Sequence, residues 1–160
     1  SLHSLNFLGN RMNYELLLGY QRNLIDASLD DISGVSILSG WCGGQYGANQ
    51  DKWRNAVSRF VFRNYSSGLI GCVNPDIYKI KDIVKFSKKY ETLEVDVNEE
   101  SLVLWNGVIY SSTKKLDELI ERYGLGDWRY LDFDVNHDFM SEIISIYKDF
   151  GSDVSDISLC

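Results

Sequence analysis

The chain has 160 residues and a mass of 18.3 kDa, which corresponds to a single domain. With 44% hydrophobic residues, 24% charged residues and one proline, its composition excludes disordered, collagen-like and low-complexity classes. The odd cysteine count, three, favours free thiols in the cytoplasm over a secreted disulfide framework. No apolar run approaches the length of a membrane-spanning helix, so we expect no membrane partner.

The charge is unevenly distributed along the chain. A formal net charge of -7 argues against a nucleic-acid ligand, because phosphate contacts require clustered lysine and arginine. Residues 52–89 carry nine basic and two acidic residues, whereas residues 117–160 carry eleven acidic and three basic residues. This division predicts a surface with one basic region and one acidic region. The electric field of either region would speed association with an oppositely charged partner.

The amino-terminal third is predicted to contain one long helix and a turn-rich loop. Residues 1–11 show no periodicity and Met12 is a plausible natural start, so we interpret them as a leader or an added remnant. Apolar residues at helical spacing predict a helix over residues 14–32. A short strand over residues 35–38 and a glycine-rich turn over residues 40–47 follow.

The middle of the chain is predicted to hold two more helices and a strand. Asn49 is a good cap for a second helix, whose apolar stripe buries Trp53. Residues 69–73 are typical of a short buried strand. An Asn-Pro pair at the start of residues 74–90 predicts the cap and first position of a third helix.

The most informative feature is a pair of similar segments, residues 93–102 and 131–140. Each opens with strict apolar and acidic alternation, which predicts a half-buried strand, and each then reaches an asparagine that can cap a helix. Their similarity would also fit an internal repeat. If the strands are neighbours, their carboxylates share one sheet face and repel each other, which favours a cationic partner. The alternative is a face whose charges are screened by solvent.

We therefore predict a partner-binding face formed by carboxylates from both segments. The first choices are Glu94, Asp96, Asp132 and Asp134, and the carboxylates around them are Glu99, Glu100 and Asp138.

The remaining elements complete the predicted fold. Residues 102–105 look helical, residues 108–110 extended, residues 113–123 a capped helix closed by glycine, and residues 136–150 a last helix. Residues 151–160 form an acidic tail that we expect to fray. The pattern predicts one α+β domain over residues 12–150, with about five helices packed on a small mixed β-sheet.

A cysteine-dependent hydrolase is the enzyme alternative. It would use Cys42 of the glycine-rich loop as nucleophile and His137 as base, with Asn136 or Asp138 orienting the imidazole ring. The sequence around Cys42 lacks a known protease signature. An ordinary loop cysteine is therefore the favoured interpretation.

Metal and cofactor sites are not indicated. Asp132, Asp134, Asn136 and Asp138 fall at loop positions 1, 3, 5 and 7 of an EF-hand, but histidine and isoleucine occupy the positions that require glycine and glutamate. Two histidines without paired cysteines do not make a zinc site. The glycine-rich loop lacks a phosphate-binding fingerprint, so we predict neither metal nor cofactor.

A lysine-rich stretch gives a further alternative. Its residues would form one face of the third helix and could contact RNA or an acidic protein, although solubility is the simpler explanation. They are Lys79, Lys81, Lys85, Lys88 and Lys89.

The stretch KWRNAV at residues 52–57 predicts a tryptophan-bearing helix, and GLI at residues 68–70 predicts the strand that follows. With the acidic single-domain character, this pattern resembles the cytoplasmic immunity proteins of bacterial contact-dependent and polymorphic toxin systems. The resemblance implies a non-catalytic protein that covers a cognate toxin domain, often a basic nuclease. Such families share no binding motif, so no site residue is carried over. Besides the hydrolase, a regulatory module without a toxin partner is the alternative.

Overall fold

The computed structural model describes the backbone of residues 2–158 and the side chains of residues 13–158. The predicted leader, residues 1–11, therefore lies outside the described side chains, as do the last two residues of the predicted tail. The described chain contains six α-helices: α1 (Leu2–Leu29), α2 (Gln50–Ser66), α3 (Ile83–Thr92), α4 (Glu99–Leu102), α5 (Lys114–Arg122) and α6 (His137–Asp149). Shorter helical segments are η1 (Gly34–Ser36), η2 (Gly44–Tyr46), the π-helix η3 (Val103–Gly107) and η4 (Trp128–Asp132).

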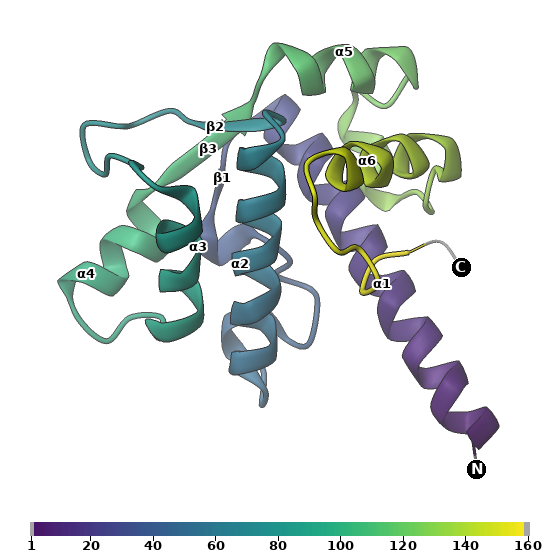
Figure 1. Ribbon diagram of the computed structural model, residues 1–160, viewed down its shortest axis with the longest axis horizontal. Coiled ribbons are helices and arrows are strands. Elements are labelled where there is room, and N and C mark those ends of the chain that lie inside the picture. The colour runs from purple at the N-terminus through teal and green to yellow at the C-terminus, as the bar shows by residue number, and fades with distance from the viewer. Residues whose placement is uncertain (1, 159–160) are drawn as a thin grey trace.

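A small sheet lies among these helices. Its described strands are β1 (Ile32–Ser33), β2 (Ile70–Cys72) and β3 (Ile109–Ser112). They are ordered β1-β3-β2 and both pairs are antiparallel, with Tyr110 opposite Ile32 on one side and Cys72 on the other. In Figure 1, α3 and α4 lie on one side of α2, while α6 lies on the other and α1 crosses the molecule diagonally. The α+β class is confirmed, but the sheet is antiparallel rather than mixed.

Two stacked tryptophans lie within the core. Trp53 of α2 and Trp105 of η3 are both fully buried, with ring centroids 5.0 Å apart. Each indole N–H donates to a backbone carbonyl, that of Ile37 at 3.0 Å and that of Leu93 at 2.9 Å. The predicted burial of Trp53 is confirmed, and no polar atom of this pair is left without a partner.

Three of the four predicted asparagine caps are confirmed. The side-chain oxygens of Asn49, Asn98 and Asn136 each accept from the amide three residues on, at the starts of α2, α4 and α6. Gly124, predicted to close α5, has a φ of 67°, a left-handed conformation that glycine adopts without strain. Local sequence therefore specifies these helix ends.

The third helix starts later than predicted. Asn74 does not cap a helix, because its side chain bonds to the backbone where η3 leads into β3: Oδ1 accepts from the Ile109 amide at 2.9 Å and Nδ2 donates to the Gly107 carbonyl at 2.5 Å. The cap of α3 is Asp82, whose Oδ1 accepts from the Val84 amide at 3.0 Å.

The strand predicted over residues 35–38 is also wrong. Residues 34–36 form η1, and the side chain of Asn23 on α1 accepts from the Leu38 amide at 2.8 Å and donates to the Ser36 carbonyl at 3.3 Å. These backbone groups are bonded to a helix side chain, so they need no strand partner.

The carboxyl-terminal segment, residues 151–158, packs onto the body of the molecule instead of fraying. Val154 is 5% exposed and Ile157 is fully buried. The guanidinium of Arg63, itself buried, donates to the Asp153 carbonyl at 2.7 Å and pairs with the Asp156 carboxylate at 2.6 Å. The segment is thus anchored by two apolar side chains and one buried ion pair.

Candidate functional site

The two predicted acidic strands are loops. Residues 93–97 connect α3 to α4, and Asp96 has a φ of 65°, which is incompatible with an extended strand. Residues 131–135 finish η4 and lead into α6. The strand prediction is wrong because neither segment pairs with another strand within the described residues, and alternation alone does not supply a partner.

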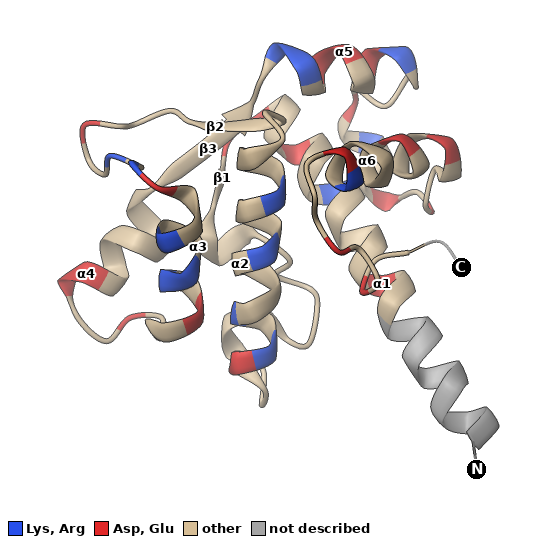
Figure 2. Cartoon of the chain, in the orientation of Figure 1, with Lys and Arg blue, Asp and Glu red and all other residues tan. Residues whose placement is uncertain are grey.

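The predicted carboxylates do not share one face. Glu94, Asp96, Glu99 and Glu100 lie around α4, whereas Asp132, Asp134 and Asp138 lie around the start of α6. Figure 2 shows these two regions on opposite sides of the molecule. All seven residues are exposed, and within the first group Glu100 is 3.9 Å from the ammonium of Lys89. The prediction of a single acidic sheet face is therefore wrong.

Exposed aromatic side chains accompany the second group of carboxylates. Trp128 is 52% exposed and Phe133 is 53% exposed, and Tyr130 lies edge-on to Phe133 with ring centroids 5.0 Å apart. We call this region the aromatic–acidic surface; it consists of Asp127, Trp128, Tyr130, Asp132, Phe133, Asp134 and Asp138. The sequence assigned Phe133 to a buried strand face, and no sequence signal indicated that it would lie exposed against Tyr130.

One arginine lies within this segment, and its side chain interacts with two residues of the same segment. The guanidinium of Arg129 lies 5.1 Å from the centre of the Tyr130 ring and 3.9 Å from the Asp127 carboxylate. A guanidinium so placed is attracted by both the ring face and the carboxylate. Asp132, Asp134 and Asp138 form no ion pair with any described residue, so their charges remain available to a partner.

A buried glutamine on α1 holds this surface in place. The side chain of Gln21 is fully buried, donates to the Asp134 carbonyl at 3.1 Å and accepts from the Asn136 amide at 2.7 Å. Val135, between these two residues, is 8% exposed. The loop is therefore fixed at three consecutive positions, and the flanking aromatic and acidic residues are displayed from an ordered backbone.

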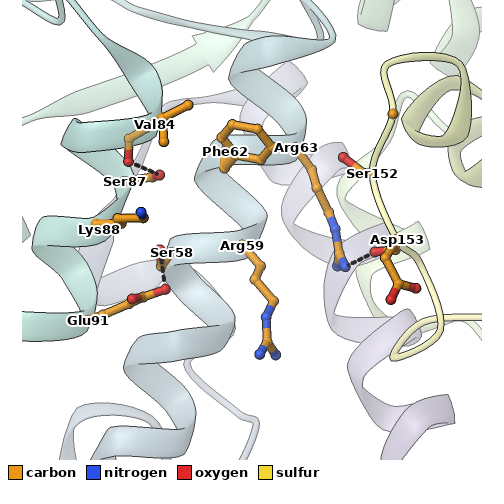
Figure 3. Close-up of a pocket in the computed structure, with 11 residues that line it drawn as sticks. Ser58, Arg59, Phe62, Arg63, Val84, Ser87, Lys88, Glu91, Ser152 and Asp153 are labelled. Carbon is orange, nitrogen blue, oxygen red and sulfur yellow. Dashed lines mark hydrogen bonds between the residues drawn. The ribbon is translucent and has the colours of Figure 1, made fainter.

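A groove between α2, α3 and the carboxyl-terminal segment is the second candidate site (Figure 3). It encloses about 370 Å³, near the lower limit for ligand pockets. Its lining residues come from all three segments and include Ser58, Arg59, Phe62, Arg63, Val84, Ser87, Lys88, Glu91, Ser152 and Asp153.

Arg63 forms one wall of this groove. Its guanidinium also donates to the Tyr20 hydroxyl at 2.9 Å, so it connects α1, α2 and the carboxyl-terminal segment. Burial raises the pKa of Tyr20 to about 12, although the positive charge of Arg63 opposes that rise. Arg63 is consequently a structural cation, and the other cations of the groove are those available for binding.

Cys42 and His137 show none of the features of a nucleophile and its base. Burial raises the pKa of the Cys42 thiol and Lys52 offsets this only partly, so the reactive thiolate is disfavoured. His137 is exposed at the start of α6, and within the described residues no hydrogen bond joins it to Cys42. The loop of Cys42 is a tight turn, as predicted, because a side chain at Gly47 would lie 2.0 Å from the Cys42 carbonyl oxygen.

The EF-hand-like residues have other roles. Asp134 accepts from the Val135 amide at 2.9 Å, and Asn136 accepts from the Phe139 amide at 3.0 Å as the cap of α6. Among the described residues, no three His, Cys, Asp or Glu side chains gather closely enough to hold a metal ion. The segment is thus organised by the backbone rather than around a cation.

Within residues 2–158, no helix combines the length and apolar character needed to cross a membrane. Neither a protein-family model, nor a curated protein, nor a solved structure matches the chain.

Proposed function

We propose that this chain is a non-catalytic, cytoplasmic immunity-type protein that neutralises a basic, nuclease-like toxin domain by covering its active or substrate-binding surface. The observation that carries the proposal is the aromatic–acidic surface. It places two half-exposed aromatic side chains, Trp128 and Phe133, among carboxylates on a loop fixed by Gln21.

The residue types of this surface suit a protein partner. Tryptophan and tyrosine are enriched among the residues that supply most of the affinity at protein interfaces, and charges around them add specificity and faster association. A nuclease presents a cationic surface to the phosphates of its substrate. A face ringed by carboxylates would compete with nucleic acid for that same surface, and binding alone would then block the toxin.

The hydrogen bonds of Gln21 support high affinity in a second way. Immobilising a flexible loop and its side chains costs free energy when a complex forms. Here the loop backbone is already bonded at Asp134 and Asn136 before any partner arrives. Less ordering is required on binding, so more of the contact free energy appears as affinity.

Co-expression with the product of the adjoining gene tests the proposal, because toxins and their antidotes are usually encoded together. We expect that product to stop growth, and this chain to restore it. Calorimetry with the purified proteins then measures the affinity of the partner for the unchanged chain and for the charge-reversed variant Asp132→Lys/Asp134→Lys. Loss of close interfacial charge pairs should weaken binding by about 10-fold or more.

A matched control separates a local contact from the effect of net charge. Glu99→Lys/Glu100→Lys makes the same change in net charge on the opposite acidic group, and we expect unchanged affinity. Equal weakening by both variants would reject the aromatic–acidic surface as the contact. An adjoining product that is neither toxic nor bound would reject the immunity function and favour a regulatory module.

The variant Gln21→Ala tests the fixed loop. We expect faster hydrogen exchange of the Asn136 amide, which loses its acceptor, while the Met140 amide of α6 keeps its bond to the Asn136 carbonyl and its slow exchange. Affinity for the partner should fall although no contact residue is changed. Unchanged exchange at Asn136 would show that the loop does not depend on Gln21.

A further inference from the structure

The groove between α2, α3 and the carboxyl-terminal segment contains two basic side chains that have no ion-pair or hydrogen-bond partner among the described residues. Figure 3 shows Arg59 of α2 and Lys88 of α3 among its lining side chains. Both are exposed, and neither forms an ion pair or hydrogen bond with any described residue. An arginine has five N–H donors and a lysine has three, so the groove contains many free donors that carry positive charge.

The carboxylates of the groove are engaged within the chain. Glu91 accepts from the Ser58 hydroxyl at 3.2 Å. Asp153 accepts from the Ser155 amide at 2.9 Å, and hydrogen bonds from Ser155 hold the pKa of Asp153 below its usual value. These donors are neutral, so both carboxylates keep their charge. Together with the cavity that adjoins it, the groove is lined by four basic and three acidic residues, a net charge of +1, so its complementary ligand is an anion.

The groove continues beyond Arg59. A second cavity of about 380 Å³ also includes Arg59 and extends toward Lys52 at the start of α2. Its other lining residues are Asn13, Leu16, Trp41, Asn55 and Asp156. The stretch of α2 from Lys52 to Phe62 that borders both cavities spans about 15 Å at 1.5 Å per residue, which matches about five residues of extended peptide.

The lining also contains apolar surface. Phe62 is half-buried and Val84 is 47% exposed in the first cavity, and Leu16 and Trp41 lie in the second. A peptide can place carboxylates opposite Arg59 and Lys88 and apolar side chains opposite these residues. A nucleic-acid strand fits less well, because it carries a phosphate at every nucleotide and so brings more negative charge than a lining of net charge +1 can balance.

We infer that this groove binds an extended acidic segment of a partner protein, with its carboxylates on Arg59 and Lys88 and its apolar side chains on Phe62 and Val84. This site goes beyond the immunity function and does not rest on it. The two surfaces have no residue in common, and they select partners of opposite charge.

Fluorescence anisotropy with the full chain tests the inference. The probe is a fluorescein-labelled hexapeptide of alternating leucine and glutamate. We expect saturable binding, weakened about 10-fold or more in Arg59→Glu/Lys88→Glu, since reversal turns two attractions into repulsions. The control Lys79→Glu/Lys114→Glu makes the same change in net charge at exposed lysines outside the groove, and it should bind the peptide normally.

Other outcomes are equally decisive. Absence of peptide binding by the unchanged protein, or equal weakening in both double variants, would overturn the inference. So would binding of a uridine hexanucleotide that competes with the peptide and is lost with Arg59 and Lys88. If reversal disturbs folding by circular dichroism, Arg59→Gln and Lys88→Gln replace it. Normal peptide binding by Asp132→Lys/Asp134→Lys would show that the groove acts independently of the aromatic–acidic surface.

Discussion

Three of the four tryptophans of this chain occupy two opposite environments. Trp53 and Trp105 are fully buried, and each indole N–H reaches a backbone carbonyl. Trp128 lies on η4 and keeps half of its surface in water. The first environment contributes to stability through packing, and the second leaves an aromatic side chain available for binding.

This contrast predicts that the same substitution, tryptophan to alanine, has different effects on stability at the two kinds of position. Trp105→Ala should lower the free energy of unfolding by about 3–5 kcal/mol, because it leaves a cavity beside Trp53. Trp128→Ala should change it by less than about 0.5 kcal/mol, because no core contact is lost. Urea denaturation followed by circular dichroism measures both. A comparable loss in the two variants would contradict the burial of one and the exposure of the other.

The Arg63–Asp156 pair is a second feature at this scale. Arg63 is 5% exposed, so removal of its partner leaves a poorly solvated guanidinium. We expect Asp156→Asn to lower the free energy of unfolding by about 1.5–3 kcal/mol, the range for hydrogen bonds to charged groups. Asp149→Asn, at the exposed end of α6, is the control and should have little effect. Equal denaturation midpoints for the two variants would show that the buried pair contributes nothing.

At the scale of secondary structure, the cap of α3 is not the residue that local sequence suggests. An asparagine before a proline is a common helix start, yet the side chain of Asn74 bonds to the backbone where η3 leads into β3, and the later Asp82 caps α3. The competing partners of Asn74 lie at Gly107 and Ile109, more than thirty positions away. No local pattern contains that information.

Crossed variants test these roles. Asn74→Ala should speed hydrogen exchange of the Ile109 amide, whose acceptor it removes, while exchange within α3 stays slow. Asp82→Ala should do the reverse, fraying the first turn of α3 and costing about 0.5–2 kcal/mol. Exchange by nuclear magnetic resonance resolves both sites. The same exchange profile in both variants would contradict the separate roles.

The acidic segments show why part of the candidate site was predictable and part was not. Exposure of Asp132, Asp134 and Asp138 followed from charge, and Asn136 was correctly identified as a cap. Strand formation depends on a partner at a distance, and here the backbone bonds to Gln21 instead. Whether two acidic segments meet is likewise a property of the whole fold, and it could not be inferred from either segment alone.

Across the whole molecule, the sequence predicted the α+β class, the burial of Trp53 and the helix ends marked by Asn49 and Gly124. These features depend on residues close together in the chain. The predictions that failed concern contacts between distant segments, such as the mixed sheet and the fraying of residues 151–158. Ile157 is buried against residues from other elements, and the polar residues next to it in the sequence gave no indication of that burial.

Buried tyrosines predict how the whole molecule responds to alkali. Burial raises the pKa of Tyr20 to about 12, and it also raises the pKa values of Tyr90, Tyr110 and Tyr147 above the ordinary 10.0. Well below pH 10.0 these tyrosines are protonated in both states, so their ionisation does not lower the free energy of unfolding. Above it they ionise in the unfolded chain first, so the free energy of unfolding falls as pH rises toward the folded pKa values.

Urea midpoints measured at about pH 9 and about pH 11 should therefore differ markedly. Tyr147→Phe should reduce the difference, because it removes one of the titrating hydroxyls. Tyr46→Phe, which changes an 89% exposed side chain, should leave it unchanged. A midpoint independent of pH over this range would contradict the burial of these hydroxyls.

The anchoring of residues 151–158 has a consequence for synthesis in the cell. Val154 and Ile157 belong to a core that also contains many residues translated much earlier, and Arg63 pairs with the carboxylate of Asp156. While these residues are still inside the ribosome, a guanidinium and apolar surface of the nascent chain stay open to water. The last step of folding must therefore follow release of residue 157 from the exit tunnel, and a message truncated shortly before its codon would yield a product prone to aggregation.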